Sequence, residues 1–237
     1  MTGGKIIPTP WHTASSQQSG YDQVVEEILS GHLAPGSKVE LVELMRRFFQ
    51  TTTDLRQAIV RLTNEGLAHQ DGPAALRINP VSVADLEELT ATRVFIERET
   101  LVRSVQSGGA AWEATVMDSY AALVEDDPSQ AEDVRAGVDV WEQRNHVFHI
   151  ALISACPIRR LREISDNFYR QHERYRRLLG GRRPVPQAAI QEHQALHKAA
   201  IARDAERAGD LLVDHIRHSA ATLADGIADG SWFGSAV

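Results

Sequence analysis

The segment that most constrains the fold covers residues 51–67 and reads TTTDLRQAIVRLTNEGL. Its apolar residues recur at helical spacing and predict one buried helix face, formed by Leu55, Ala58, Ile59 and Leu62. Thr51 suits a helix N-cap, and Gly66 suits the position just past the last turn. The preceding ELVELMRRFF has the pattern of a second short amphipathic helix, so the pair predicts a helix-turn-helix.

An ordinary helical hairpin has the same local pattern, because short amphipathic pairs are common in proteins. Strand-like segments at 67–69 and 76–78 flank Asp71-Gly72-Pro73, which indicates a β-hairpin or wing. The wing favours a winged helix-turn-helix domain over residues 21–80. Such a domain places its second helix in the major groove of DNA, so a DNA-binding function is expected.

Polar side chains near the predicted second helix could contact DNA. Arg can bridge guanine acceptors, Gln can read adenine, and Thr can contact bases or phosphates. The residues predicted to contact DNA are Arg46, Thr52, Thr53, Arg56, Gln57, Arg61 and Arg77. Residues 21–80 nevertheless hold six Lys and Arg against eight Asp and Glu, within a net charge of −7 for the chain. Binding should therefore depend on a few local cations and weaken steeply with salt.

The rest of the chain divides into an arm, a helical region and a tail. Residues 1–20 are rich in Ser, Thr, Gly, Pro and Gln, which predicts a flexible arm. Asn79-Pro80 interrupts the pattern, and a capping signal at Ser82 starts a new helical region. Helical periodicity continues over residues 82–228 and predicts an all-α bundle, followed by a tail at 229–237. The expected fold is thus mainly α, in two domains.

Composition narrows the cellular setting. The sequence has no run of about 18 apolar residues and no secretory signal pattern, so a cytoplasmic protein is expected. The single Cys156 excludes an intrachain disulfide framework and is expected to be a small buried residue rather than a nucleophile.

Histidines suggest a metal site. The chain has ten, and most of those in the helical region form three pairs about one turn apart: His146 and His149, His193 and His197, His215 and His218. Spacing does not tell which of them point inward. Metal binding and ordinary packed or solvated histidines therefore both remain open at this stage.

Several segments, in order, resemble the GntR family of transcriptional regulators, in the class that carries an FCD effector domain. DLRQAIVRLTNEGL resembles the recognition-helix signature, and VSVADLEELTATRVFIERE is similar to the first helix of the effector domain. NHVFHIAL, EHQALHKAAIARD and AGDLLVDHI resemble its later helices, so the resemblance covers about residues 21–227. It implies a homodimeric repressor that binds a palindromic operator and responds to a small carboxylate effector.

The resemblance also implies a divalent metal, such as Zn²⁺ or Ni²⁺, held by Asn145, His149, His193 and His215. Asn145 stands where the family usually has Asp. An amide is neutral and a weaker ligand than a carboxylate, so reduced metal affinity is expected. Among the other histidines, His197 is expected to be packed or to contact one of the metal ligands, and His146 and His218 are expected to be solvated.

Arg93 occupies a position that the resemblance assigns to the effector domain's first helix. A guanidinium there could grip the effector carboxylate with two hydrogen bonds. The alternative is a buried ion pair with Glu97, one helical turn further on.

Departures from the family pattern leave other functions open. Across the turn, the family's Gly-Val-Ser-Arg is replaced by Phe49-Gln50-Thr51-Thr52, so the chain could be a sensor or scaffold with a degenerate DNA head. A metal-dependent hydrolase is less favoured, because Glu192 should point about 100° away from His193 and the HExxH motif is absent from the sequence. We predict a ligand-responsive DNA-binding regulator and no enzymatic activity.

Overall fold

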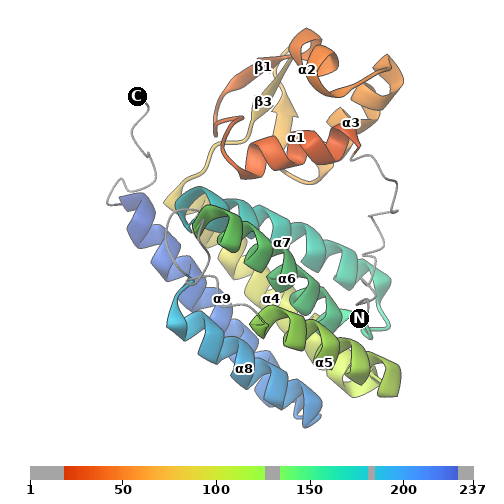
Figure 1. Cartoon of the computed structure of the whole chain (residues 1–237), viewed down its shortest axis with the longest axis vertical. Helices are drawn as coiled ribbons and strands as arrows, with labels where there is room; N and C mark the ends of the chain where they lie inside the picture. Colours follow the sequence, from red (N-terminus) through yellow and green to blue (C-terminus); the bar gives the residue numbers. More distant parts are fainter. Residues whose placement is uncertain (1–18, 126–133, 181–184, 229–237) are drawn as a thin grey trace.

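The computed structural model describes residues 19–125, 134–180 and 185–228. Figure 1 shows a small N-terminal domain, termed the DNA head below, seated on a larger bundle of helices. Ser19 caps the first helix, which therefore begins at Gly20, inside the arm expected from the sequence. Residues 1–18 of that arm and the tail at 229–237 lie outside the described ranges.

The DNA head contains three helices and a three-stranded antiparallel sheet in the order β1-β3-β2. Its elements are α1 (Gly20–Leu29), β1 (Lys38–Glu40), α2 (Leu41–Phe48), α3 (Thr52–Asn64), β2 (Ala68–Gln70) and β3 (Ala75–Ile78). Strand β3 pairs with both neighbours, with Leu76 opposite Val39 of β1 and Gln70 of β2. The sheet excludes the ordinary helical hairpin and confirms the predicted winged helix-turn-helix.

Helix α3 begins and ends where its capping residues predict. The Thr51 side chain accepts a hydrogen bond from the Asp54 amide at 3.1 Å, which satisfies one of the free N–H groups of the first turn. Gly66 follows the last turn with φ of 70°, a left-handed conformation that glycine adopts without strain. Leu55, Ala58 and Leu62 are buried in the core of the head, as predicted.

The core of the head joins all of its elements. Its fully buried side chains come from α1, α2, α3, the wing and the strands, and include Val24, Ile28, Leu44, Leu62, Leu67, Leu76 and Ile78. Each contributes roughly 1.5–3 kcal/mol on burial, which suffices to hold α3 in place on a domain of this size.

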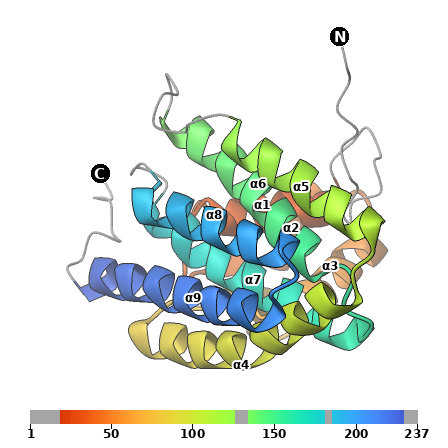
Figure 2. The same ribbon diagram turned by 90° about the horizontal axis from the view of Figure 1, so that it is seen from below.

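In the part of the chain that the structure describes, six helices form the second domain. They are α4 (Val83–Ser107), α5 (Ala110–Val124), α6 (Val134–Ile153), α7 (Arg159–Gly180), α8 (Gln187–Ile201) and α9 (Ala205–Ala228). Ser82 caps α4 by accepting a hydrogen bond from the Asp85 amide, as predicted. Figure 2 shows α4 and α9 side by side along one edge of the bundle, with α7 behind them. None of the helices in the described ranges is both long enough and apolar enough to cross a lipid bilayer.

Candidate functional site

The exposed face of α3 carries most of the residues predicted to contact DNA. Thr52, Thr53, Arg56 and Gln57 are all exposed in its first two turns. The opposite end of α3 contacts the bundle, because Gln171 of α7 donates a hydrogen bond to the Glu65 carbonyl at 3.0 Å. The polar N-terminal turns therefore point away from the bundle, where a DNA groove could receive them.

Two of the predicted DNA contacts are instead held by neighbouring side chains of the head. The Arg61 guanidinium lies 3.5 Å from the centroid of the Tyr21 ring. Arg77 donates to Asp71 Oδ2 at 2.9 Å and to the Gly36 carbonyl at the same distance. A DNA role for these two stays a prediction that requires them to leave or share these partners.

Arg46 and Arg56 have more freedom. Both are exposed, and neither forms an ion pair with any residue that the structure describes. They are therefore the cations of the predicted set most available to phosphates or bases.

Three histidines from three helices converge inside the bundle. His149 of α6, His193 of α8 and His215 of α9 each offer a ring nitrogen, and these atoms all lie within 4.8 Å of one another. His149 Nε2 and His193 Nε2 are 3.2 Å apart. Nitrogens bound to one Zn²⁺ at 2.0–2.1 Å would be roughly 3.3 Å apart in tetrahedral geometry. The predicted imidazole ligands are thus placed together at a spacing that a metal ion fits.

Asn145 lies one turn before His149 on α6 and is only 2% exposed. Its Oδ1 atom has no hydrogen-bond partner among the residues that the structure describes. Leaving a buried acceptor without a partner costs about 1–3 kcal/mol, and a metal ion or a donor group of a ligand would remove that cost. The donor set of three imidazoles and one oxygen therefore fits the metal that the sequence suggested.

The protonation states of His149 and His193 also suit metal binding. Burial, followed by the nearby imidazoles and guanidinium groups, holds the pKa values of His149 and His193 well below the usual range for histidine. Both rings are consequently neutral near pH 7, which is the form that binds metals.

Glu192 orients the third imidazole. His215 Nδ1 donates to Glu192 Oε2 at 2.7 Å, which leaves the other ring nitrogen for a ligand. Burial would raise the pKa of Glu192, but hydrogen bonds from His215 and His218 outweigh this effect and lower it. The carboxylate is therefore ionised and committed to these two rings.

A cavity of about 290 Å³ opens beside this cluster. Asn145, Glu192 and His215 line the end of the cavity nearest the imidazoles. The remaining wall is largely apolar and includes Val138, Trp141, Val185, Ala189 and Leu223. The cavity can thus hold a molecule that is polar at one end and apolar along its body.

Among the residues that the structure describes, Arg176 is the arginine that lines this cavity, and the sequence did not single it out. It donates to Glu142 from Nε at 2.9 Å and from Nη2 at 2.7 Å, and its Nη1 donates to His172 Nδ1 at 2.9 Å. Nothing in the sequence distinguishes Arg176 from the other arginines of the same helix. Only the packing of α7 against α6 places it at the cavity.

Arg93 forms the buried pair that was the alternative to effector binding. It donates to Glu97 from Nε at 2.6 Å and from Nη2 at 3.1 Å, and is 2% exposed. Arg93 is not among the residues that line the 290 Å³ cavity in the described chain. Its contact with an effector stays a prediction.

The other histidines differ in part from expectation. His197 stacks on Tyr120 with ring centroids 4.1 Å apart, so its predicted packing is confirmed. His218 is exposed, as predicted. The expectation that His146 is solvated is wrong, because α7 places Asp166 2.7 Å from its Nε2 and Tyr169 against its ring.

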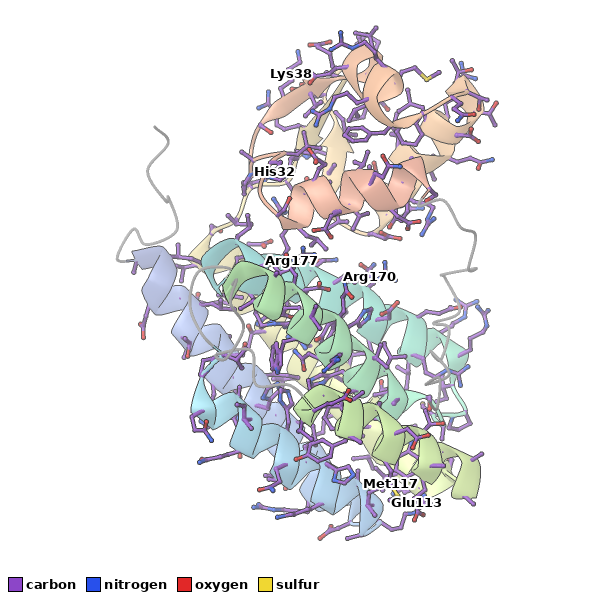
Figure 3. The ribbon with its side chains drawn as sticks, viewed as in Figure 1. His32, Lys38, Glu113, Met117, Arg170 and Arg177 are labelled. Carbon is purple, nitrogen blue, oxygen red and sulfur yellow. The ribbon has the colours of Figure 1, made fainter. Side chains whose placement is uncertain are left out.

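Helix α7 also connects the cavity to the DNA head. Arg177, next to the cavity residue Arg176, donates to Glu26 Oε2 of α1 at 2.9 Å and to Asp139 of α6 at 3.2 Å. Arg174 donates to the carbonyl of Asn79 in the linker. Figure 3 shows Arg170 and Arg177 on the side of α7 that faces the head. A shift of α7 would therefore change contacts both at the cavity and at the DNA head.

Comparison with known proteins gives a family match for each of the two domains. Residues 17–72 match the model of the bacterial regulatory proteins of the gntR family, and residues 88–218 match that of the FCD domain. The chain is 35% identical to the uncharacterized HTH-type transcriptional regulator BphR of Paraburkholderia xenovorans, over 85% of this chain and 82% of the relative. It is 26% identical to the HTH-type transcriptional repressor GlaR of Escherichia coli, over 83% and 90%. The solved structure of E. coli McbR/YncC has the same fold, with a TM-score of 0.72 and 17% identity, over 89% of this chain and all of that one.

Proposed function

This chain belongs to the GntR family of bacterial regulatory proteins and carries an FCD domain, and from that premise we propose that it is a ligand-responsive repressor. The family assignment makes it a transcriptional regulator. In the proposal, a small carboxylate enters the helical domain, binds with the help of a divalent metal, and lowers the affinity of the DNA head for its operator.

The observation that carries the proposal is the unpartnered Oδ1 of Asn145 beside three converging imidazoles, at the end of a cavity. Protein interiors rarely leave such an acceptor unpaired unless something else binds it. Bound Zn²⁺ or Ni²⁺ would supply a Lewis-acid position for a carboxylate oxygen. Asn145 and the three imidazoles would hold the ion, and Glu192 would keep the His215 ring in the required orientation.

The wall of the cavity indicates the class of effector. The carboxylate would lie at the Asn145 end, and the body of the molecule would run along Trp141, Val138 and Leu223. Arg176 is already paired with Glu142, so its positive charge is largely neutralised within the protein. We therefore expect an acid with an aromatic or branched aliphatic body to bind more tightly than a short, fully polar acid.

Repression, rather than activation, is supported by the relative from E. coli whose name describes it as a repressor. The response to the effector would run through α7, because Arg176 faces the cavity and Arg177 contacts the DNA head. An effector needs to favour one arrangement of the head over the other by about 1–3 kcal/mol to give a useful response.

DNA binding is tested by fluorescence anisotropy with the full-length protein, using DNA from its own upstream region and a scrambled duplex over a salt series. Arg56→Ala should weaken specific binding by about 1–3 kcal/mol, whereas Arg159→Ala, an exposed arginine at the far end of α7, should not. Equal binding to both duplexes, unchanged by Arg56→Ala, would instead support a scaffold with a degenerate DNA head.

The effector is tested on the same complex. Carboxylic acids with apolar bodies and short polar acids of matched charge are added to Zn²⁺-loaded protein on the specific duplex. Release by the first group and not by the second supports the proposal. Release by neither group, together with unchanged thermal stability of the protein, contradicts it.

A further inference from the structure

Trp141, Ala189 and Ser219 line the cavity one helical turn away from the candidate metal ligands. Each lies four residues from one of these ligands, on α6, α8 and α9 respectively. The rise of an α-helix places them about 6 Å further along the cavity than the ligands themselves. We call this the Ser219 level. The cavity opens to solvent beyond it, where the lining residues Pro186 and Thr222 are exposed.

The Ser219 hydroxyl forms no hydrogen bond with any residue in the part of the chain that the structure describes. Hydroxyls within helices often donate to a carbonyl one turn earlier, as Thr222 of the same helix does to the His218 carbonyl at 3.1 Å. Ser219 is instead half-buried in the wall of the cavity with its hydroxyl uncommitted. Both its O–H group and its lone pairs are therefore available to a molecule bound there.

Trp141 supplies a flat apolar surface at the same level. Its side chain is buried, and its ring lies against the His193 ring with centroids 5.8 Å apart. Ala189 contributes only a methyl group to the cavity wall on α8. Aromatic rings pack on an indole in offset or tilted arrangements, which stabilise the contact beyond the burial of apolar area alone. An aromatic ring therefore suits this level better than a branched aliphatic group.

The volume of the cavity limits the bound molecule to a single ring. A cavity of about 290 Å³ holds roughly ten water-sized groups of about 30 Å³ each. A benzoate that carries one hydroxyl has about that many non-hydrogen atoms. With its carboxylate at the Asn145 end, the ring would lie beside Trp141. A hydroxyl on the part of the ring remote from the carboxylate would then reach Ser219.

We propose that the effector is a single-ring aromatic acid with a hydroxyl meta or para to its carboxylate, and that Ser219 selects it by a hydrogen bond to that hydroxyl. This inference rests on the proposed function and adds to it the class of the ligand and the residue that recognises it. A hydroxyl ortho to the carboxylate would stay near Asn145 and would not reach Ser219.

The test is isothermal titration calorimetry of the full-length, Zn²⁺-loaded protein with benzoate and its 2-, 3- and 4-hydroxy derivatives. Wild type should bind the better of the 3- and 4-hydroxy acids about 3- to 10-fold more tightly than benzoate, because one further hydrogen bond forms. Ser219→Ala should remove this gain and leave the affinities for benzoate and the 2-hydroxy acid unchanged. Ser154→Ala is the matched control, because Ser154 is exposed and its hydroxyl donates to the Ala151 carbonyl.

The outcomes separate this inference from the proposed function. Equal binding of benzoate and its 3- and 4-hydroxy derivatives, or a preference that survives Ser219→Ala, would overturn the role of Ser219. The proposed function would stand in that case if the same acids still release the operator. Failure of all four aromatic acids to bind would also overturn the inference, and the proposed function would then depend on release of the operator by aliphatic acids.

Discussion

Arg176 and Arg177 are neighbours on α7, yet their side chains serve two different parts of the molecule. Arg176 pairs with Glu142 in the wall of the cavity, and Arg177 pairs with Glu26 on the first helix of the DNA head. Closely packed side chains at a junction of this kind are expected to change arrangement together, because close packing leaves little room for independent movement. One helix therefore joins the candidate effector site to the candidate DNA-binding surface.

The side chain at position 145 should set the metal affinity. Asn145→Asp introduces a carboxylate one turn from His149 and should tighten Zn²⁺ and Ni²⁺ binding by about 10-fold or more, since a charged oxygen ligand is stronger than an amide. His193→Ala removes an imidazole and should weaken binding by a larger factor. Isothermal titration calorimetry measures both, with exposed His32→Ala as the matched control. Equal affinities for wild type and Asn145→Asp would place the metal, if bound, elsewhere.

Arg93 and Glu97 form a buried ion pair whose loss should be costly. Arg93→Met leaves the Glu97 carboxylate buried without its partner and should lower the free energy of unfolding by about 3–5 kcal/mol. The double variant Arg93→Met/Glu97→Met should recover much of that loss, because no charge remains in the interior. Urea denaturation of wild type, Arg93→Met, Glu97→Met and the double variant completes the double-mutant cycle. If Arg93→Met is as stable as wild type and loses only effector binding, Arg93 contributes to binding the effector and its pair with Glu97 contributes little to stability.

His172 should make the fold sensitive to acid. Burial, followed by repulsion from Arg93 and Arg176, holds the pKa of His172 well below that of an exposed histidine. Below a pH of about 6.5 the unfolded chain binds a proton at this ring and the folded chain does not. The free energy of unfolding therefore decreases as the pH is lowered, by up to roughly 1.4 kcal/mol per pH unit.

His172→Gln keeps a hydrogen-bond acceptor for Arg176 and removes the titrating ring. The variant should therefore show a shallower loss of stability between pH 6.5 and 5 than wild type. His32→Gln, at an exposed position, should leave the slope unchanged. The measurement is the urea midpoint across this pH range. An identical slope in wild type and His172→Gln would mean that the buried ring does not contribute.

The sequence alone predicts a helix or strand correctly where the interactions that define it lie close together along the chain. Helix α3 has a regular apolar face, a Thr51 cap and Gly66 past its end, and each of these lies within a few residues of the others. Strand β1 was missed because it spans three residues and depends on pairing with β3, as in the contact of Val39 with Leu76. Helix α1 was also not predicted, although it supplies the Glu26 contact to the bundle.

Tertiary packing decided the candidate site. His146 and His149 are about one turn apart on α6, but His146 contacts Asp166 of α7 and is not among the three imidazoles that converge. Family resemblance correctly selected the three histidines that meet, which spacing could not. Arg176 became recognisable only once α7 was placed against the cavity.

In the proposed function, effector binding in the cavity and operator binding by the DNA head depend on each other. Because such coupling is reciprocal, the dissociation constant of a carboxylic acid that releases the DNA should differ by about 5- to 150-fold between free and operator-bound Zn²⁺-loaded protein. Arg177→Gln, which removes the contact with Glu26, should bring the two constants together, and Arg159→Gln should not. An affinity of the wild-type protein for this acid that is the same with and without operator would contradict the account.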